Sequence, residues 1–147
     1  MKSARNMIVA TLVSLGAGLA AASPGTLVEM YKLASCGCCD KWAEHMESNG
    51  FKVRVHVVPE TGTHREKAGM PAKYGSCHTA KVGGYVVEGH VPAADVKRLL
   101  AQRPKAVGIA VPGMPLGSPG MEQGGVNLDY DVLLVRSGGA AEVFAKH

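Results

Sequence analysis

The chain has 147 residues, which is enough for one ordinary domain after an N-terminal leader. Removing Lys2 and Arg5 from the formal net charge of +4 leaves +2, and that balance, with no Lys/Arg cluster, argues against a nucleic-acid-binding protein. Aromatic residues are few, and 19 Gly with 8 Pro predict an irregular fold with long loops.

The first 22 residues have the pattern of a secretory signal peptide. Lys2 and Arg5 precede an apolar run from Met7 to Ala22 that ends in small residues. The alternative is a membrane anchor, but a span needs about 20 apolar residues, and this run is shorter and contains two Gly. We therefore expect export to the periplasm, removal of residues 1–22, a single domain over residues 23–147, and no stable membrane insertion afterwards.

The next segments alternate strands with helices. Residues 26–33 alternate apolar and polar side chains, as a half-buried strand does. A cysteine turn follows, and residues 40–49 then favour a helix with Trp42 and Met46 on one face. Residues 51–58 predict a second strand, one side of which carries Phe51, Val53, Val55 and Val57.

The rest of the chain predicts a short helix at 64–68 and a hairpin over 80–87 that turns at Gly83-Gly84. A helix from Pro92 ends before Pro104. Residues 111–125 form a long Pro/Gly/Met loop, and a hairpin over 130–135 and 141–145 closes the chain. A strand, a cysteine turn, a helix and a parallel return strand together predict a βαβ opening, and hence an α/β, thioredoxin-like fold.

Three of the four cysteines, Cys36, Cys38 and Cys39, lie within four residues, and the fourth is Cys77. An even cysteine count in an exported protein is typical of structural disulfides. The spacing argues against that role, because the Cα atoms of adjacent residues are about 3.8 Å apart and a disulfide usually needs about 4.4–6.8 Å. Only a bridge to Cys77 would be both long-range and free of strain.

Two functional interpretations of these cysteines stay open. Redox exchange would use Cys36 and Cys39, because the C-x-x-C spacing at a helix N-terminus lowers a thiol pKa. Metal binding would use all four, since soft thiolates favour Cu(I), zinc or iron–sulfur chemistry. On a helix with about 100° per residue, Cys38 would point away from the other two. Either Cys38 lies in the preceding loop, or thiolates bridge more than one ion, which suits Cu(I).

The candidate outer ligands lie further along the chain. In a thioredoxin-like fold the loop before the third strand packs against the cysteine turn, so Cys77 would face that turn. His78 is a candidate because imidazole suits copper, although a lone histidine more often forms a hydrogen bond. We expect His90 to be structural.

Two Pro-Gly-Met triplets end at Met114 and Met121. Thioethers are Cu(I) ligands and poor ligands for hard ions. The alternative is that both methionines fill gaps in the core as adaptable side chains. Both residues are therefore candidate ligands.

Four motifs occur in a fixed order: SCGCC at 35–39, SCHT at 76–79, EGHVP at 88–92, and VPGMP at 111–115 running through Met121 and Glu122. With them, residues 27–147 resemble the CopG-like family of small exported metal-binding proteins, long catalogued as a domain of unknown function. The resemblance implies a thioredoxin-like fold, a copper site on the cysteine turn, and a role in periplasmic copper resistance. Transferred residue by residue, it implies that Cys36, Cys38, Cys39 and Cys77 are the ligands.

The leading hypothesis is a periplasmic protein that binds copper as Cu(I), one ion or more, for copper resistance and homeostasis. It would sequester the metal, pass it to other periplasmic copper-handling proteins, or change its oxidation state, and whether it is an enzyme is left open. The alternative is a periplasmic thiol–disulfide oxidoreductase of the thioredoxin type, and a structural zinc site is a weaker third interpretation.

Overall fold

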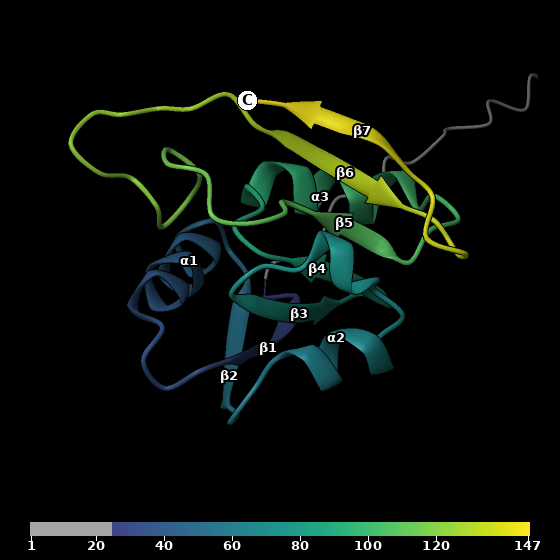
Figure 1. Cartoon of the computed structure of the whole chain (residues 1–147), viewed down its shortest axis with the longest axis horizontal. Helices are drawn as coiled ribbons and strands as arrows, with labels where there is room; N and C mark the ends of the chain where they lie inside the picture. The colour runs from purple at the N-terminus through teal and green to yellow at the C-terminus, as the bar shows by residue number, and fades with distance from the viewer. Residues whose placement is uncertain (1–24) are drawn as a thin grey trace, which may run out of the picture.

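A seven-stranded mixed sheet organises the chain (Figure 1). The computed structural model describes residues 25–147, so the predicted signal peptide lies outside the described residues. The strand order is β2-β1-β3-β4-β5-β6-β7. In chain order the strands are β1 Leu27–Lys32, β2 Lys52–Val57, β3 His78–Val82, β4 Tyr85–Glu88, β5 Gly108–Ala110, β6 Asp131–Val135 and β7 Ala141–Lys146.

Two strand–helix–strand units make the parallel parts of this sheet. The α1 helix (Gly37–Ser48) connects β1 to β2, and α3 (Ala93–Gln102) connects β4 to β5. The other neighbouring strands are antiparallel. The predicted α/β class and the βαβ opening are confirmed. Sequence analysis missed β5, because a strand of only three residues is too short to show an alternating pattern.

The two faces of the sheet carry separate hydrophobic clusters. The larger one lies under α1 and α3, where Trp42, Met46 and Leu99 are fully buried. The smaller one contains Met70 and Val86 and lies on the side of α2 (Gly62–Lys67) and the short 3₁₀ helix η1 (Ala72–Tyr74). Neighbouring residues of a strand point to opposite faces, and Val86 and Val87 accordingly belong to different clusters.

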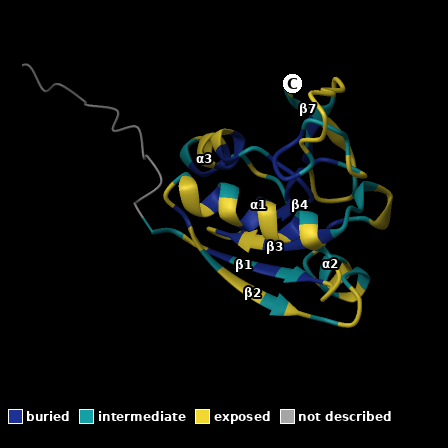
Figure 2. Ribbon diagram, turned by 90° about the vertical axis from the view of Figure 1, so that its left-hand side faces the viewer, coloured by how far each residue is buried: buried dark blue, intermediate teal, exposed yellow. Residues whose placement is uncertain are grey.

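The apolar side chains in and next to β2 differ in their burial. Phe51 is buried, but Val55 and Val57 are 42% and 62% exposed. Val55 and Val57 are exposed because β2 is an edge strand of the sheet. Figure 2 shows exposed colouring along β2 and buried colouring along the inner strands.

Several strand ends meet at one end of the sheet, and this positions the site. The β1 strand runs into the cysteine turn, and its last residue, Lys32, pairs with His78, the first residue of β3. At the end of β4, the backbone N–H of Gly89 donates to the carbonyl of His78. Just after β5, the N–H of Val111 donates to the carbonyl of Glu88. The antiparallel pairing therefore brings together segments that are distant in sequence.

Residues 111–130 form the long connection between β5 and β6. Apart from one isolated bridge between Gln123 and Val126, the segment contains no strand or helix, as the Pro and Gly content predicted. Within residues 25–147, no helix is long and apolar enough to cross a bilayer.

Candidate metal centre

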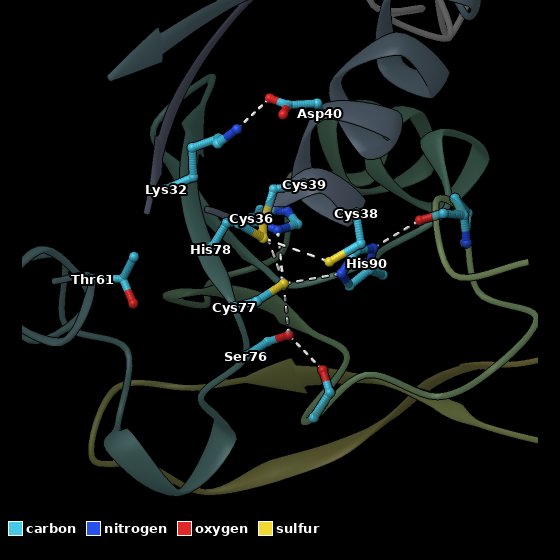
Figure 3. The surroundings of a disulfide bond; sticks show 12 residues. Lys32, Cys36, Cys38, Cys39, Asp40, Thr61, Ser76, Cys77, His78 and His90 are labelled. Carbon is cyan, nitrogen blue, oxygen red and sulfur yellow. Dashed lines mark hydrogen bonds and ion pairs between the residues drawn. A yellow bond between two sulfur atoms is a disulfide. The ribbon is translucent and has the colours of Figure 1, made fainter. Parts of the chain in front are cut away.

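Three of the four cysteines lie at the N-terminus of α1. The helix begins at Gly37, so Cys36 is its N-cap and Cys38 and Cys39 belong to the first turn. Cys36 and Cys39 form a disulfide, while Cys38 and Cys77 are free (Figure 3). Backbone N–H groups of a first turn lack partners within the helix, and the helix dipole is positive there. The position therefore stabilises thiolates once the disulfide is reduced.

All four sulfur atoms come together. The Sγ atom of Cys38 is 3.5 Å from that of Cys36, and the Sγ atom of Cys77 is 3.4 Å from that of Cys39. The four sulfurs lie within 4.8 Å of one another. Cys38 is not in the preceding loop, which was one of the two alternatives. The Cys38 sulfur can approach that of Cys36 because Cys36, as the N-cap, does not have helical backbone angles.

The environment of Cys77 keeps its thiol protonated. Burial raises the pKa of this thiol to about 12, the proximity of Cys38 adds to the rise, and a hydrogen bond from the Ser76 hydroxyl lowers the pKa. In the disulfide form, Cys77 is therefore a neutral thiol at neutral pH. A metal ion would have to displace its proton.

Two buried histidines flank the Cys77 sulfur. His90 Nε2 is 3.0 Å from Cys77 Sγ, and His90 Nδ1 is 2.8 Å from the carbonyl oxygen of Pro119. A carbonyl only accepts hydrogen bonds, so Nδ1 carries the proton and Nε2 directs its lone pair at the sulfur.

His78 Nδ1 is 3.5 Å from Cys77 Sγ, and among the described residues His78 Nε2 has no hydrogen-bond partner. Burial lowers the pKa of both histidines, that of His78 to well below its ordinary value. Both imidazoles are therefore neutral and able to offer a lone pair. Cys77, His78 and His90 place one ligand atom each within 4.8 Å of the others.

His90 was predicted to be structural and was not among the predicted ligands. The predicted hairpin could have indicated that His90 lies close to Cys77. Because the chain turns at Gly83-Gly84, the residues that follow β4 must lie beside those that precede β3. That pairing puts the segment around His90 next to Cys77.

The two Pro-Gly-Met triplets pack against segments that hold the cluster. The carbonyl of Gly113 accepts a hydrogen bond from the Ser76 hydroxyl, next to Cys77. At Gly120, where φ is +87°, an added Cβ would lie 2.7 Å from the carbonyl oxygen of Cys38. Only glycine permits both this conformation and this approach. The long loop therefore covers the N-terminus of α1.

Met114 is 52% exposed and Met121 is partly exposed. The alternative that both methionines fill the core is therefore wrong for Met114. Ligation by Met114, Met121 or His78 stays a prediction, as does ligation by the four cysteines.

A buried cation lies beside the cluster. Lys32, which is 4% exposed, forms an ion pair with Asp40 in the first turn of α1 (Figure 3). Its positive charge also contributes to lowering the pKa of His78.

The donor atoms fit a soft metal ion. Within the described residues, the two groups that could hold a metal consist of sulfur and imidazole nitrogen alone, with no carboxylate. Thiolate and imidazole suit copper and zinc, whereas Mg²⁺ and Ca²⁺ require oxygen ligands.

Comparison with known proteins agrees with this geometry. A family model described as "Protein of unknown function, DUF411" matches residues 74–121, which span Cys77, His78 and His90. No curated protein matches the chain. Two solved structures, named "Copper resistance protein copG- Form 1" and "Form 2", are each 45% identical to it. Each superposes with a TM-score of 0.79, covering 84% of this chain and 98% of the other.

The chain belongs to the CopG family of copper resistance proteins. The resemblance inferred from four short motifs is thereby confirmed. Both structural matches cover nearly the whole of the related chain, so the similarity extends well beyond the segment that the family model matches. The chain is a homologue of copper resistance proteins, and its cysteine cluster is able to bind metal.

Proposed function

We propose that this CopG-family protein binds Cu(I) in the periplasm, for copper resistance and homeostasis, through Cys36, Cys38, Cys39 and Cys77. The observation that supports this proposal most strongly is the approach of all four sulfurs to within 4.8 Å of one another. His78, Met114 and Met121 are the further candidate ligands, and His90 joins them on its 3.0 Å distance to Cys77.

Copper is favoured over zinc by the crowding of the sulfurs. A structural zinc site usually draws four ligands from well-separated pairs, whereas Cys38 and Cys39 are adjacent and Cys36 is two residues before Cys38. Thiolates this close can bridge ions, which suits more than one Cu(I). Neutral imidazoles are also ligands of copper, as are thioethers such as those of the candidate residues Met114 and Met121.

The disulfide between Cys36 and Cys39 must be reduced before all four cysteines can bind copper. With Cys36 and Cys39 bonded, only Cys38 and Cys77 remain as thiols. Two electrons and two protons from an external dithiol restore the other two. We expect the reduced protein to hold at least one more copper per chain than the oxidised protein.

The test is a copper titration of the mature protein, reduced with dithiothreitol, desalted without oxygen, and mixed with Cu(I) in the presence of a competing chromophoric chelator. The proposal requires at least one copper per chain that the chelator does not remove. A parallel titration with Zn²⁺ shows the preference. Retention of less than one copper would defeat the proposal, and tighter retention of zinc would favour a structural zinc site.

The second candidate is a thiol–disulfide oxidoreductase, and the disulfide at the N-terminus of α1 is the observation that favours it. A Cys77 thiolate attacking the Cys39 sulfur, 3.4 Å away, would form a Cys39–Cys77 bond and release the Cys36 thiolate. The raised pKa of Cys77 disfavours that attack, because the thiolate is the nucleophile. Insulin reduction that survives Cys38→Ser and Cys77→Ser would support this activity through Cys36 and Cys39 alone.

We also propose that residues 1–22 are a cleaved signal peptide and that residues 23–147 form one thioredoxin-like domain. Support comes from the N-terminal pattern and from the βαβ opening with its C-x-x-C turn. Other periplasmic copper-handling proteins would be its partners. N-terminal sequencing of the protein from a periplasmic extract tests the cleavage, and a mature chain that still begins at Met1 would contradict it.

A further inference from the structure

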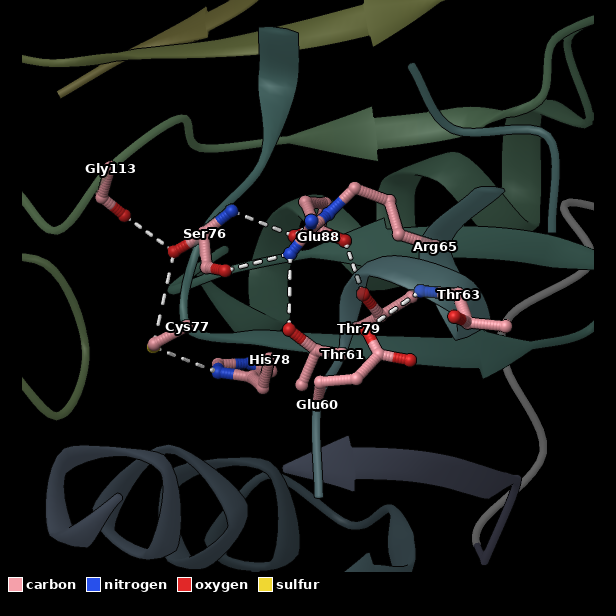
Figure 4. Close-up of polar contacts among 10 residues, drawn as sticks. All are labelled: Glu60, Thr61, Thr63, Arg65, Ser76, Cys77, His78, Thr79, Glu88 and Gly113. Carbon is pink, nitrogen blue, oxygen red and sulfur yellow. Dashed lines mark hydrogen bonds and ion pairs between the residues drawn. The ribbon is translucent and has the colours of Figure 1, made fainter. Parts of the chain in front are cut away.

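A buried ion pair between Arg65 and Glu88 lies beside Ser76, the residue before Cys77 (Figure 4). Arg65 belongs to α2, and Glu88 is the last residue of β4. Arg65 Nε is 2.8 Å from Glu88 Oε1, and the side chains are 11% and 0% exposed. Neither residue is a metal ligand or contacts one of the sulfurs directly.

The pair holds both backbone polar groups of Ser76, the residue before Cys77. The N–H of Ser76 donates to Glu88 Oε1 at 2.8 Å, and Arg65 Nη2 donates to the carbonyl of Ser76 at 2.8 Å. The other carboxylate oxygen of Glu88 accepts from the hydroxyl of Thr79 at 2.6 Å. Both residues that flank the Cys77–His78 segment are thus tied to one carboxylate, Ser76 through its backbone N–H and Thr79 through its side-chain hydroxyl.

Stability alone does not account for this arrangement. Removing two charges from water costs several kcal/mol per ion, and well-packed apolar residues of similar size often serve stability equally well. What the ion pair adds is geometry, because the guanidinium donates from two nitrogens in fixed directions to two acceptors at once. Here the acceptors are the Glu88 carboxylate and the backbone of the segment that leads into Cys77.

We propose that Arg65 and Glu88 are positioning residues for Cys77, which hold its sulfur within reach of Cys39 and His90 and thereby set the affinity of the cluster for copper. The statement about affinity rests on the proposed function, whereas the statement about position does not. Partners that orient a metal ligand typically contribute 10–100-fold to metal affinity.

The position of Cys77 can be measured without any metal. In a Cys36→Ser/Cys38→Ser background, only Cys39 and Cys77 can form a disulfide. Oxidation by glutathione disulfide converts these two thiols into one protein disulfide and yields two molecules of glutathione. The equilibrium gives the effective concentration of one thiol at the other, which depends steeply on how the two are held.

Glu88→Gln and Arg65→Lys are then added separately to this background. Glutamine keeps the shape of Glu88 but loses its charge, and lysine keeps the charge of Arg65 but loses the two-nitrogen geometry. We expect each to lower the effective concentration about tenfold or more. In the chain with all four cysteines, each should also weaken Cu(I) binding about tenfold or more in the chelator assay.

The matched control is Asp95→Asn. Asp95 is also buried and ion-paired, with Arg98, but it lies on α3. In this variant, the effective concentration of the thiols and the affinity for Cu(I) should both stay within about twofold of their values without the substitution. The comparison separates a positioning effect from a general loss of stability.

If Glu88→Gln does not fold, Arg65→Lys decides the question, because Arg65 lies nearer the surface. A folded variant whose effective concentration stays within about twofold of the background would overturn the proposal. A tenfold fall in a protein that binds no copper would leave the positioning role intact and refute only the proposed function.

Discussion

Two polar clusters in this molecule, one around the buried Asp95 and one around the cysteines, differ in whether every polar atom has a hydrogen-bond partner. On α3, Asp95 accepts from Arg98 Nη2 at 3.0 Å and from His147 Nε2 at 2.7 Å. Each carboxylate oxygen therefore has a donor. At the end of β1, by contrast, sulfurs and imidazoles face one another, and His78 Nε2 lacks a partner within the described residues.

The difference supports the proposal that the cysteine cluster, and not the Asp95 cluster, holds a ligand. The Asp95 cluster ties the C-terminal residue to α3 and needs nothing further. Thiols are weak hydrogen-bond donors and acceptors, so contacts of 3.0–3.5 Å among sulfur and imidazole stabilise the fold little. Burial of His78 Nε2 without a partner is costly, and a soft metal ion would use such a lone pair.

The largest expected effect is that of Cys39→Ser. This sulfur is fully buried at the centre of the cluster, and a hydroxyl is a poor ligand for Cu(I). We expect a loss of about one copper per chain or a decrease in affinity of more than about 100-fold, measured by chelator competition. Circular dichroism of the metal-free variant checks that it is folded, and undiminished copper binding by folded Cys39→Ser would remove Cys39 from the site.

The second effect concerns the pH dependence of Cys77 alkylation in the disulfide form. Because burial raises the pKa of Cys77 to about 12, the rate with iodoacetamide should still rise about tenfold per pH unit between pH 8 and pH 10. A free cysteine reaches its plateau above its own pKa of about 8.5. Peptide mapping by mass spectrometry separates Cys77 from Cys38, and the protein unfolded in urea is the control. A plateau near pH 9 in the folded protein would show that Cys77 is solvated.

A third prediction concerns Asp95, the central residue of the cluster on α3. Asp95→Asn should lower the free energy of unfolding by about 1–2 kcal/mol, since it replaces a buried carboxylate whose partners are partly exposed. Copper stoichiometry should not change. Urea denaturation and copper titration of the same preparation test both statements, and a loss of copper would mean that the two clusters are coupled.

The smallest effect is expected for Met114→Leu. Met114 is half exposed, and leucine preserves its volume while removing the thioether. Copper affinity should fall by a few-fold at most, about 1 kcal/mol or less. If this substitution abolished binding while Cys39→Ser did not, the assignment of the ligands would be reversed.

The local pattern of the sequence predicted much of the fold, for physical reasons that the structure makes clear. Apolar alternation and glycine turns indicated β1, the hairpin of β3 and β4, and the terminal hairpin, because these depend on neighbouring residues. The exposure of Val57 could not be predicted, since it depends on the position of β2 at the edge of the sheet.

The same distinction applies to the site. Cys36, Cys38 and Cys39 were visible as a group because they are close in sequence. His90 was not, because its proximity to Cys77 follows from strand pairing. The contacts between Arg65, Glu88 and the backbone of Ser76 are likewise tertiary, and no spacing in the sequence indicates them.

The central claim is that four sulfurs hold copper together, and X-ray absorption at the copper edge tests it most directly. The sample is mature protein isolated from copper-fed cells, with copper content determined on the same material. We expect at least one copper per chain, an edge typical of Cu(I), and a first shell dominated by sulfur. A shell of nitrogen and oxygen alone, or protein isolated without copper, would contradict the account.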